Sequence, residues 1–351
     1  WISHEHSDHF HEPSLKLFDK ATPVYVPDFP NRRMVEMLAD MGFSDVRPMA
    51  FGETYHVSED IKLTCFEPGS LWNDSMVLIE IGEFRFLNLN DAGLNPRIAS
   101  QVGPVDMVAS AFSPGASGYP MTWDHLEDAR KTEIMESARQ GCIELLKEAM
   151  DLYGGKYLLP FAGHFALWHP SHLKYVQLMR KNTVDDILEA FEQTDVTVLN
   201  LLPGESWDGP SGEFSRCWDQ RKEIYKRDSF LKRLSDSFDL SVFEEHHPAH
   251  KTPSKEAVEG YFLSLNDVPD IIFCDELTVT LRTREIGSDL RELEVAFEIK
   301  DSTLTILPEP PESPNLVIEI PGGILQRVID ENLSWDEVHI GYWCHFSRSP
   351  D

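Results

Sequence analysis

The sequence has few basic residues, with 31 lysines and arginines against 60 aspartates and glutamates among 351 residues, a formal net charge of −29. A chain with this charge repels phosphate backbones, which argues against a nucleic-acid-binding protein. Long apolar runs are also missing, because none approaches the roughly 18 residues that a membrane span needs. We therefore expect neither nucleic-acid nor membrane partners.

Cysteine is scarce, and its spacing is uninformative. The five cysteines show no CxxC or CxH pattern, so they offer no iron–sulfur or zinc-knuckle framework, and we expect reduced thiols in a cytoplasmic protein. The apolar share of 41% and the charged share of 26% are typical of a globular chain and not of a disordered one. A chain of this length is expected to form one to three domains.

Strands and helices alternate over residues 1–204, which predicts layered α/β packing. The predicted elements are strand 23–26, helix 31–41, strands 61–66, 76–81, 84–89 and 105–110, helix 124–153, strand 157–160, helix 184–193 and strand 196–201. Gly141 leaves open a break within the longest of these helices.

The pattern changes after Pro203. Residues 205–269 are polar and are predicted to be a connecting region of helices and loops. From about residue 270 apolar residues alternate with period two, which predicts a small α+β domain over 270–351. Its predicted elements are strands 277–281, 293–299, 304–307 and 316–320, helix 323–332 and a last strand near 338–343.

Residues 4–9 carry four side chains of the kinds that bind metals. They read His-Glu-His-Ser-Asp-His, so His4, His6, Asp8 and His9 fit HxHxDH. His4 and His6 point the same way from an extended segment, while Asp8 and His9 follow on a turn and reach a second position. Imidazole suits iron or zinc, and carboxylates shift the preference toward harder ions. The motif predicts a metal site, and the alternative is a polar surface loop.

Two residues far along the chain also stand directly after predicted strands. Asp91 follows strand 84–89, where a carboxylate is well placed to bridge two metals, and His164 follows strand 157–160. Alone, the aspartate would be a turn former and the histidine an ordinary loop residue. With HxHxDH upstream, both are predicted ligands.

This pattern resembles the metallo-β-lactamase fold, a four-layer αββα sandwich that holds one or two metals at its sheet edges. Three further parts of the chain are similar to CMP-N-acetylneuraminate hydroxylases: residues 112–122, residues 160–163 with His169-Pro170, and the tail from Trp335-Asp336 to residues 348–351. The resemblance implies a catalytic domain over 1–204 whose first strands precede Trp1. It also implies that this domain holds non-haem iron and oxygenates a nucleotide sugar. In that family the electrons come from an N-terminal Rieske domain.

The sequence departs from that family pattern in three places. No histidine stands in residues 67–74, where the fold family has one before the bridging aspartate, so Glu67 or Asp74 is the substitute. The alignment with the hydroxylase pattern favours Asp74, and a carboxylate there favours iron over zinc. No Rieske ligand set is present in these residues, so such a domain either precedes them or is replaced by another electron donor. His164 stands where the hydroxylase pattern has tyrosine, which favours a dinuclear site.

Two functions remain open. The first is a di-iron oxygenase of a small polar metabolite, which uses O₂ and an external donor such as a ferredoxin or reductase. The second is a dinuclear zinc hydrolase of an ester, lactone or phosphodiester. In either case Asp8 and Asp91 are the predicted catalytic residues. The predicted metal ligands are His4, His6, Asp8, His9, Asp74, Asp91 and His164. A non-catalytic relative is disfavoured because the ligand set looks complete.

Overall fold

The computed structural model describes most of the chain. The described residues are 1–70, 73–162, 165, 167, 169–176, 178–209, 211–219, 233, 236–237, 239, 241, 251–268, 276–284, 291–331 and 333–349. The chain forms two compact units, the first from residues 1–115, 137–165 and 181–226, and the second from residues 116–136, 166–180 and 227–351. The domain limits predicted above, 1–204, 205–269 and 270–351, stay a prediction.

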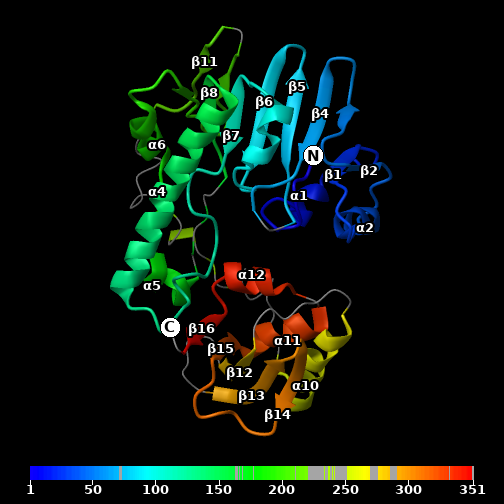
Figure 1. Ribbon diagram of the computed structural model, residues 1–351, viewed down its shortest axis with the longest axis vertical. Coiled ribbons are helices and arrows are strands. Elements are labelled where there is room, and N and C mark those ends of the chain that lie inside the picture. The colour runs from blue at the N-terminus through cyan, green and yellow to red at the C-terminus, as the bar shows by residue number, and fades with distance from the viewer. Residues whose placement is uncertain are drawn as a thin grey trace. The chain divides into compact units, whose positions relative to one another are not determined.

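A seven-stranded mixed sheet is the centre of the first unit, with strand order β3-β4-β5-β6-β7-β8-β9 (Figure 1). Its strands β3 to β6 are antiparallel, whereas β6 to β9 run parallel. The strands are β3 (Thr54–His56), β4 (Ile61–Phe66), β5 (Met76–Ile81), β6 (Phe84–Asn90), β7 (Met107–Ser110), β8 (Tyr157–Pro160) and β9 (Thr197–Val198).

The first unit has six further helices and four short strands. These are α1 (Glu12–Leu15), β1 (Val24–Pro27), α2 (Arg33–Asp40), β2 (Val46–Met49), η1 (Pro96–Ile98), α3 (Ala99–Val102), the larger part of α4 (Asp128–Tyr153), α6 (Val184–Phe191), β10 (Ser206–Trp207) and β11 (Phe214–Ser215). Strands β1 and β2 form a separate parallel pair.

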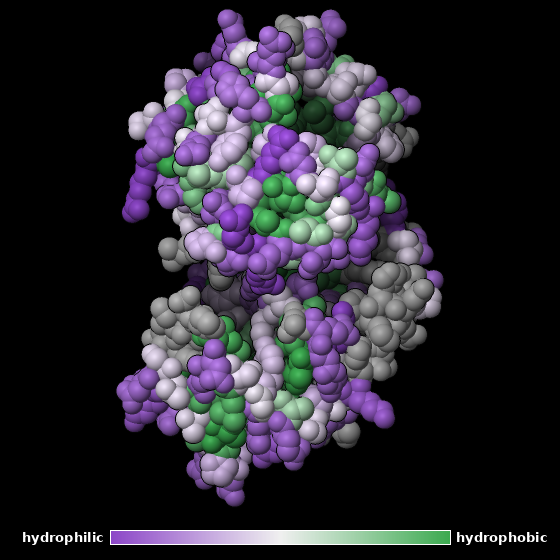
Figure 2. Space-filling view, turned by 90° about the vertical axis from the view of Figure 1, so that its right-hand side faces the viewer, coloured by the Kyte–Doolittle hydropathy of each residue, from purple (hydrophilic) through white to green (hydrophobic). Residues whose placement is uncertain are grey.

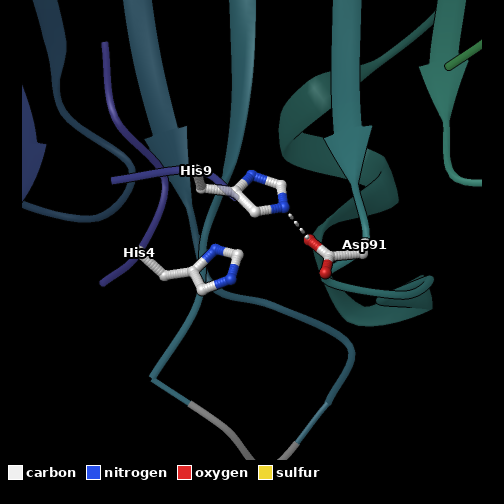
Figure 3. A group of neighbouring side chains, drawn as sticks. All are labelled: His4, His9 and Asp91. Atoms are coloured by element: carbon white, nitrogen blue, oxygen red, sulfur yellow. Dashed lines mark ion pairs between the residues drawn. The ribbon is translucent and has the colours of Figure 1, made fainter. Parts of the chain in front are cut away.

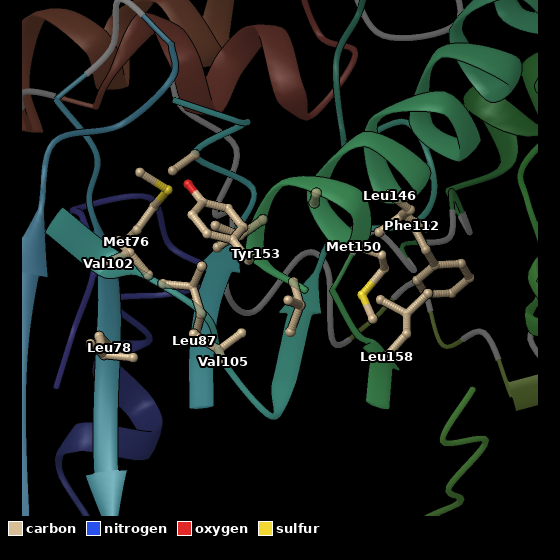
Figure 4. Close-up of a cluster of buried hydrophobic side chains, with 14 of the residues drawn as sticks. Met76, Leu78, Leu87, Val102, Val105, Phe112, Leu146, Met150, Tyr153 and Leu158 are labelled. Carbon is tan, nitrogen blue, oxygen red and sulfur yellow. The ribbon is translucent and has the colours of Figure 1, made fainter. Parts of the chain in front are cut away.

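Alternation along β5 separates two hydrophobic layers. Met76 and Leu78 face the core formed with helices α4 and α6 (Figure 4), and Val77 lies in a second cluster with Tyr25 and Met49 of the β1–β2 pair. Helix α2 packs on the other face of that pair, through a third cluster. The order helix, sheet, strand pair, helix is the four-layer αββα arrangement, and the predicted mixed α/β fold is confirmed.

Helix α4 covers the sheet with residues at helical spacing. Leu146, Ala149, Met150 and Tyr153 are all buried in the main core (Figure 4), which is the i, i+3, i+4, i+7 pattern of an amphipathic helix. The helix runs unbroken through Gly141, so the alternative of a break there is wrong. Packing of this apolar face holds the helix together despite the glycine.

Gly141→Ala is expected to stabilise the protein by about 0.5–1 kcal/mol, because glycine inside a helix loses more backbone entropy on folding than alanine does. A Cβ at this position would meet no atom within 4 Å. Thermal and urea unfolding measure the change. Gly82→Ala is the contrasting variant, because Gly82 has a φ of +59° and should lose stability. A less stable Gly141→Ala protein would contradict the expectation.

The second unit has a five-stranded sheet with strand order β14-β13-β12-β15-β16. Its strands are β12 (Leu277–Arg284), β13 (Arg291–Lys300), β14 (Thr303–Leu307), β15 (Leu316–Pro321) and β16 (His345–Arg348). Its helices are η2 (Pro170–His172), α5 (Leu173–Val176), α10 (Lys255–Ser264), η3 (Leu265–Asp267), α11 (Gly322–Glu331) and α12 (Trp335–Ile340). Helices α10 and α11 contribute Phe262 and Leu325 to one core with Leu281 and Phe297 of the sheet.

The predicted last strand near 338–343 is wrong. Residues 335–340 form helix α12, because the Ser334 side chain accepts a hydrogen bond from the N–H of Asp336 and so caps the helix. The strand comes later, as β16, and pairs with β15.

A carboxylate, a histidine and a tyrosine form a hydrogen-bonded row in the second unit. The Asp124 carboxylate lies 3.0 Å from Nδ1 of the buried His345, whose Nε2 lies 3.1 Å from the Tyr175 hydroxyl. Burial alone would raise the pKa of Asp124, but the hydrogen bond with His345 holds it below its usual range. With Nδ1–H donated to Asp124, Nε2 accepts the tyrosine proton.

Tyr175→Phe is expected to cost about 1–3 kcal/mol of unfolding free energy, because it leaves the buried Nε2 of His345 without its donor. Urea unfolding at neutral pH measures the loss. Tyr119→Phe serves as the control, since Tyr119 is 46% exposed and its loss should change little. Equal stability of the two variants would show that the row contributes nothing.

One face of the molecule is mostly polar. Figure 2 shows a face on which hydrophilic side chains surround smaller hydrophobic areas. In the part of the chain that the structure describes, no helix is both long enough and apolar enough to cross a membrane. The four described cysteines, Cys65, Cys142, Cys217 and Cys344, are free thiols.

Candidate metal centre

The HxHxDH segment is held in place at both of its ends. The N–H of Ile2 donates to the carbonyl of Tyr25 on β1 at 3.0 Å, and the Ser75 hydroxyl donates to the carbonyl of Ser3 at 2.9 Å. After the motif, Phe10 is buried in the core below β1. His4 to His9 therefore form a turn that lies across the start of strand β5.

Asn90 holds Asp91 at the end of strand β6. Its side-chain amide donates to the carbonyl of Ser75 at 2.6 Å, and its Oδ1 accepts from the backbone N–H groups of Asp91 and Ala92. Asn90 has a φ of +41°, which asparagine adopts more readily than most residues. The chain therefore turns sharply here, and the Asp91 carboxylate faces the histidine turn.

Three side chains from these two segments converge. Each of His4, His9 and Asp91 offers a ligand atom, and these atoms lie within 4.8 Å of one another. Figure 3 shows the two imidazole rings beside the carboxylate, with Nε2 of His9 3.3 Å from Oδ1 of Asp91. Two imidazoles and a carboxylate at this separation fit a transition-metal ion such as zinc or iron.

His6 adds a third imidazole to this group. Its Nδ1 lies 2.9 Å from Nε2 of His4, and the two ring centroids are 4.6 Å apart. The two ring nitrogens therefore lie within hydrogen-bonding distance of each other, and His6 lies next to the group of His4, His9 and Asp91.

The histidine and aspartate that face each other shift each other's protonation. Burial alone would lower the pKa of His9, but its hydrogen bond with Asp91 and the nearby carboxylate charges raise it overall. Burial alone would raise the pKa of Asp91, but the bond with His9 lowers it. The contact between His9 and Asp91 thus favours the charged form of each side chain, and metal binding would compete with the proton on His9.

Asp74 contacts the outer nitrogen of His4. Its carboxylate is buried, and its Oδ1 lies 3.0 Å from Nδ1 of His4, where the Ser3 hydroxyl also lies at 2.9 Å. Glu67, the other candidate of the sequence analysis, is exposed. The position of Asp74 suits a carboxylate that orients a metal-binding histidine, and its predicted role as a ligand stays a prediction.

Asp8 and His164 are the two remaining predicted ligands, and the structure describes only Asp8. Asp8 is exposed, and its Oδ2 lies 3.7 Å from Nε2 of His9. His164 lies outside the described residues. The structure thus brings together His4, His9 and Asp91, with His6 and Asp74 in contact with His4 and Asp8 next to His9.

The residues that support this group were not predicted from the sequence. Ser3, Ser75 and Asn90 hold its backbone and rings through the bonds given above. Ser3 and Asn90 directly precede His4 and Asp91 in the chain, and a short polar residue before a ligand was the available signal. Ser75 had none, because its role depends on strand pairing.

The comparisons with known proteins confirm the resemblance. No family model matches the chain. A cytidine monophosphate-N-acetylneuraminic acid hydroxylase of Danio rerio is 23% identical over an alignment that covers 100% of this chain and 61% of the relative. One of Xenopus laevis is 25% identical, with 100% and 60% covered. The chain thus spans about three fifths of the length of these relatives.

Similarity at this level includes a relative without activity. A Homo sapiens protein named as an inactive hydroxylase is 23% identical over the whole chain. Among solved structures, the metallo-beta-lactamase fold protein YhfI of Bacillus subtilis is 14% identical with a TM-score of 0.35, covering 56% of this chain and 71% of that one. A mutant of CmlA beta-hydroxylase is 21% identical with a TM-score of 0.33, covering 46% and 35%.

Proposed function

We propose that this chain is the metal-binding part of a non-haem iron oxygenase that hydroxylates a small polar metabolite. The observation that carries the proposal is the convergence of His4, His9 and Asp91 within 4.8 Å in a chain similar over its whole length to hydroxylases. One of the similar proteins is named as inactive, so similarity to hydroxylases does not by itself indicate activity. The convergence of the side chains of His4, His9 and Asp91 is what favours an active enzyme.

The residues of the centre have separate roles in this proposal. His4, His6, His9 and Asp91 hold iron, with two ions expected, and Asp8 and His164 complete the set. Bound iron supplies the one-electron chemistry that O₂ requires. Asp74 and Ser3 keep Nδ1 of His4 occupied, so that its Nε2 stays available for the metal. Asp91 is 39% exposed on its side chain and so meets the substrate side of the centre.

The electron donor lies outside these 351 residues in this proposal. The 351 residues contain no CxH with a later CxxH, so the chain itself has no Rieske ligands. An external ferredoxin or reductase is the proposed donor. Two ferrous ions hold two electrons, enough for one turnover without that donor.

We expect anaerobically reduced, iron-loaded protein to take up O₂ in a single turnover with no partner protein present. Metal analysis should find about two irons per chain, and an O₂ pulse should change the absorbance. With ¹⁸O₂ and a panel of small polar metabolites as probes, the label should enter the product of the metabolite that is turned over. The His4→Ala protein is the control.

A dinuclear zinc hydrolase is the second candidate, because two imidazoles and a carboxylate hold zinc as well as iron. Bound zinc would lower the pKa of a water toward neutrality. Asp8 or Asp91 would orient that water toward an ester, lactone or phosphodiester. Stoichiometric zinc, turnover without O₂ and product oxygen from water would replace the oxygenase with this function.

A further inference from the structure

A pocket of about 460 Å³ opens beside Asp91. One wall is the loop after β6 together with Gly69 and Ser70, and the other is a stretch of helix α4 from Gly141 to Glu148. All of these residues belong to the first unit. Pockets of this size hold small molecules, and this one has a member of the candidate metal centre in its lining.

The charged side chains that line the pocket are all acidic. They are Asp91, Glu144 and Glu148, and the lining contains no lysine, arginine or histidine among the described residues. The two glutamates are one helical turn apart and are exposed, and within the described ranges neither forms an ion pair. Bound metal would neutralise Asp91, which leaves the charges of the two glutamates on the opposite wall.

Gly141 lines this pocket on the helix side. A Cβ there would meet no atom within 4 Å, so a larger side chain would extend into open space and not into the core. Across the pocket, the Ser70 hydroxyl oxygen is buried and has no hydrogen-bond partner in the described part of the chain. The pocket therefore offers room between Asp91 and the acidic wall.

We propose that this pocket binds a substrate with a primary amine or guanidinium at one end, which lies against Glu144 and Glu148, and its reacting end at Asp91. The proposal names the substrate class of the site proposed above and rests on that function. A phosphate or carboxylate at the helix side would meet two like charges instead, on a chain of net charge −29. The charges of Glu144 and Glu148 therefore disfavour an anionic nucleotide bound against helix α4.

The test compares two probes of the same size, benzylamine and benzyl alcohol, on the zinc-loaded full chain. Zinc keeps the protein diamagnetic, so ligand-observed NMR and calorimetry report binding without any turnover. We expect benzylamine to bind about tenfold more tightly, as two partly exposed ion pairs allow. The double variant Glu144→Gln/Glu148→Gln should remove that preference, and Asp151→Asn on the same helix should keep it.

A second pair of variants tests the position of the site. Gly141→Leu should weaken both probes about tenfold or more by filling the pocket, whereas Gly260→Leu, at an equally open glycine in helix α10, should leave both nearly unchanged. Equal binding of the two probes, or a preference that survives the double variant, would overturn the proposal. If the preference is found but reduced protein consumes no O₂, the oxygenase fails and the amine-binding pocket remains.

Discussion

His4→Ala is expected to abolish stoichiometric metal binding and to lower activity by at least about 10³-fold, because a metal-activated reaction cannot proceed without its ion. His4 offers its Nε2 beside Nδ1 of His6 and within 4.8 Å of ligand atoms of His9 and Asp91. Its removal takes one donor from the centre of the group. The three remaining side chains then hold an ion much more weakly.

The measurement is metal content after dialysis, by mass spectrometry, together with calorimetric titration of zinc and ferrous iron. His56→Ala is the matched control, because His56 is an exposed histidine at the end of strand β3. His4 is 2% exposed, so circular dichroism and the unfolding midpoint must show that the variant still folds like the metal-free parent. A folded His4→Ala protein that keeps full metal content would refute the centre.

The strands that surround this centre were largely predictable. Residues 76–81 and 157–160 form β5 and β8 over the predicted ranges, and β6 extends the predicted 84–89 by one residue. Such short apolar runs between turn residues are strong local signals. They also placed Asp91 at a strand end, which is why it could be predicted as part of the site.

Other features depend on contacts between distant residues. The predicted strand 196–201 shrinks to Thr197–Val198, because only these residues pair with β8. The acidic wall of Glu144 and Glu148 reads in the sequence as one more solvated helix face. Only the packing of α4 on the sheet brings that face beside Asp91.

The sequence predicted which residues lie at the site better than it predicted what each of them does there. The residue types in HxHxDH, together with Asp91 at a strand end, predict a metal site. The structure brings His4, His9 and Asp91 together. Spacing cannot tell whether a carboxylate binds the ion or orients a histidine, because both need the same residue within a few ångströms. Asp74 is the residue for which this distinction decides the chemistry.

Asp74→Asn is expected to lower metal affinity about 10- to 100-fold while leaving the number of bound ions unchanged. The Asp74 carboxylate lies 3.0 Å from Nδ1 of His4, and it favours the tautomer that has its proton on Nδ1 and its lone pair on Nε2. An asparagine amide holds that tautomer less strongly, because it has no negative charge. Removal of a true ligand would instead lower the stoichiometry.

Competition titration with a chelator of known affinity separates these outcomes, since it reports the affinity and the number of ions together. Asp124→Asn is the matched control, because Asp124 makes the same carboxylate–imidazole bond, at 3.0 Å to Nδ1 of His345, in the second unit. It should lower stability and leave metal affinity unchanged. Loss of one ion in Asp74→Asn would make Asp74 a ligand, and with it the centre would be harder, more anionic and better suited to iron than to zinc.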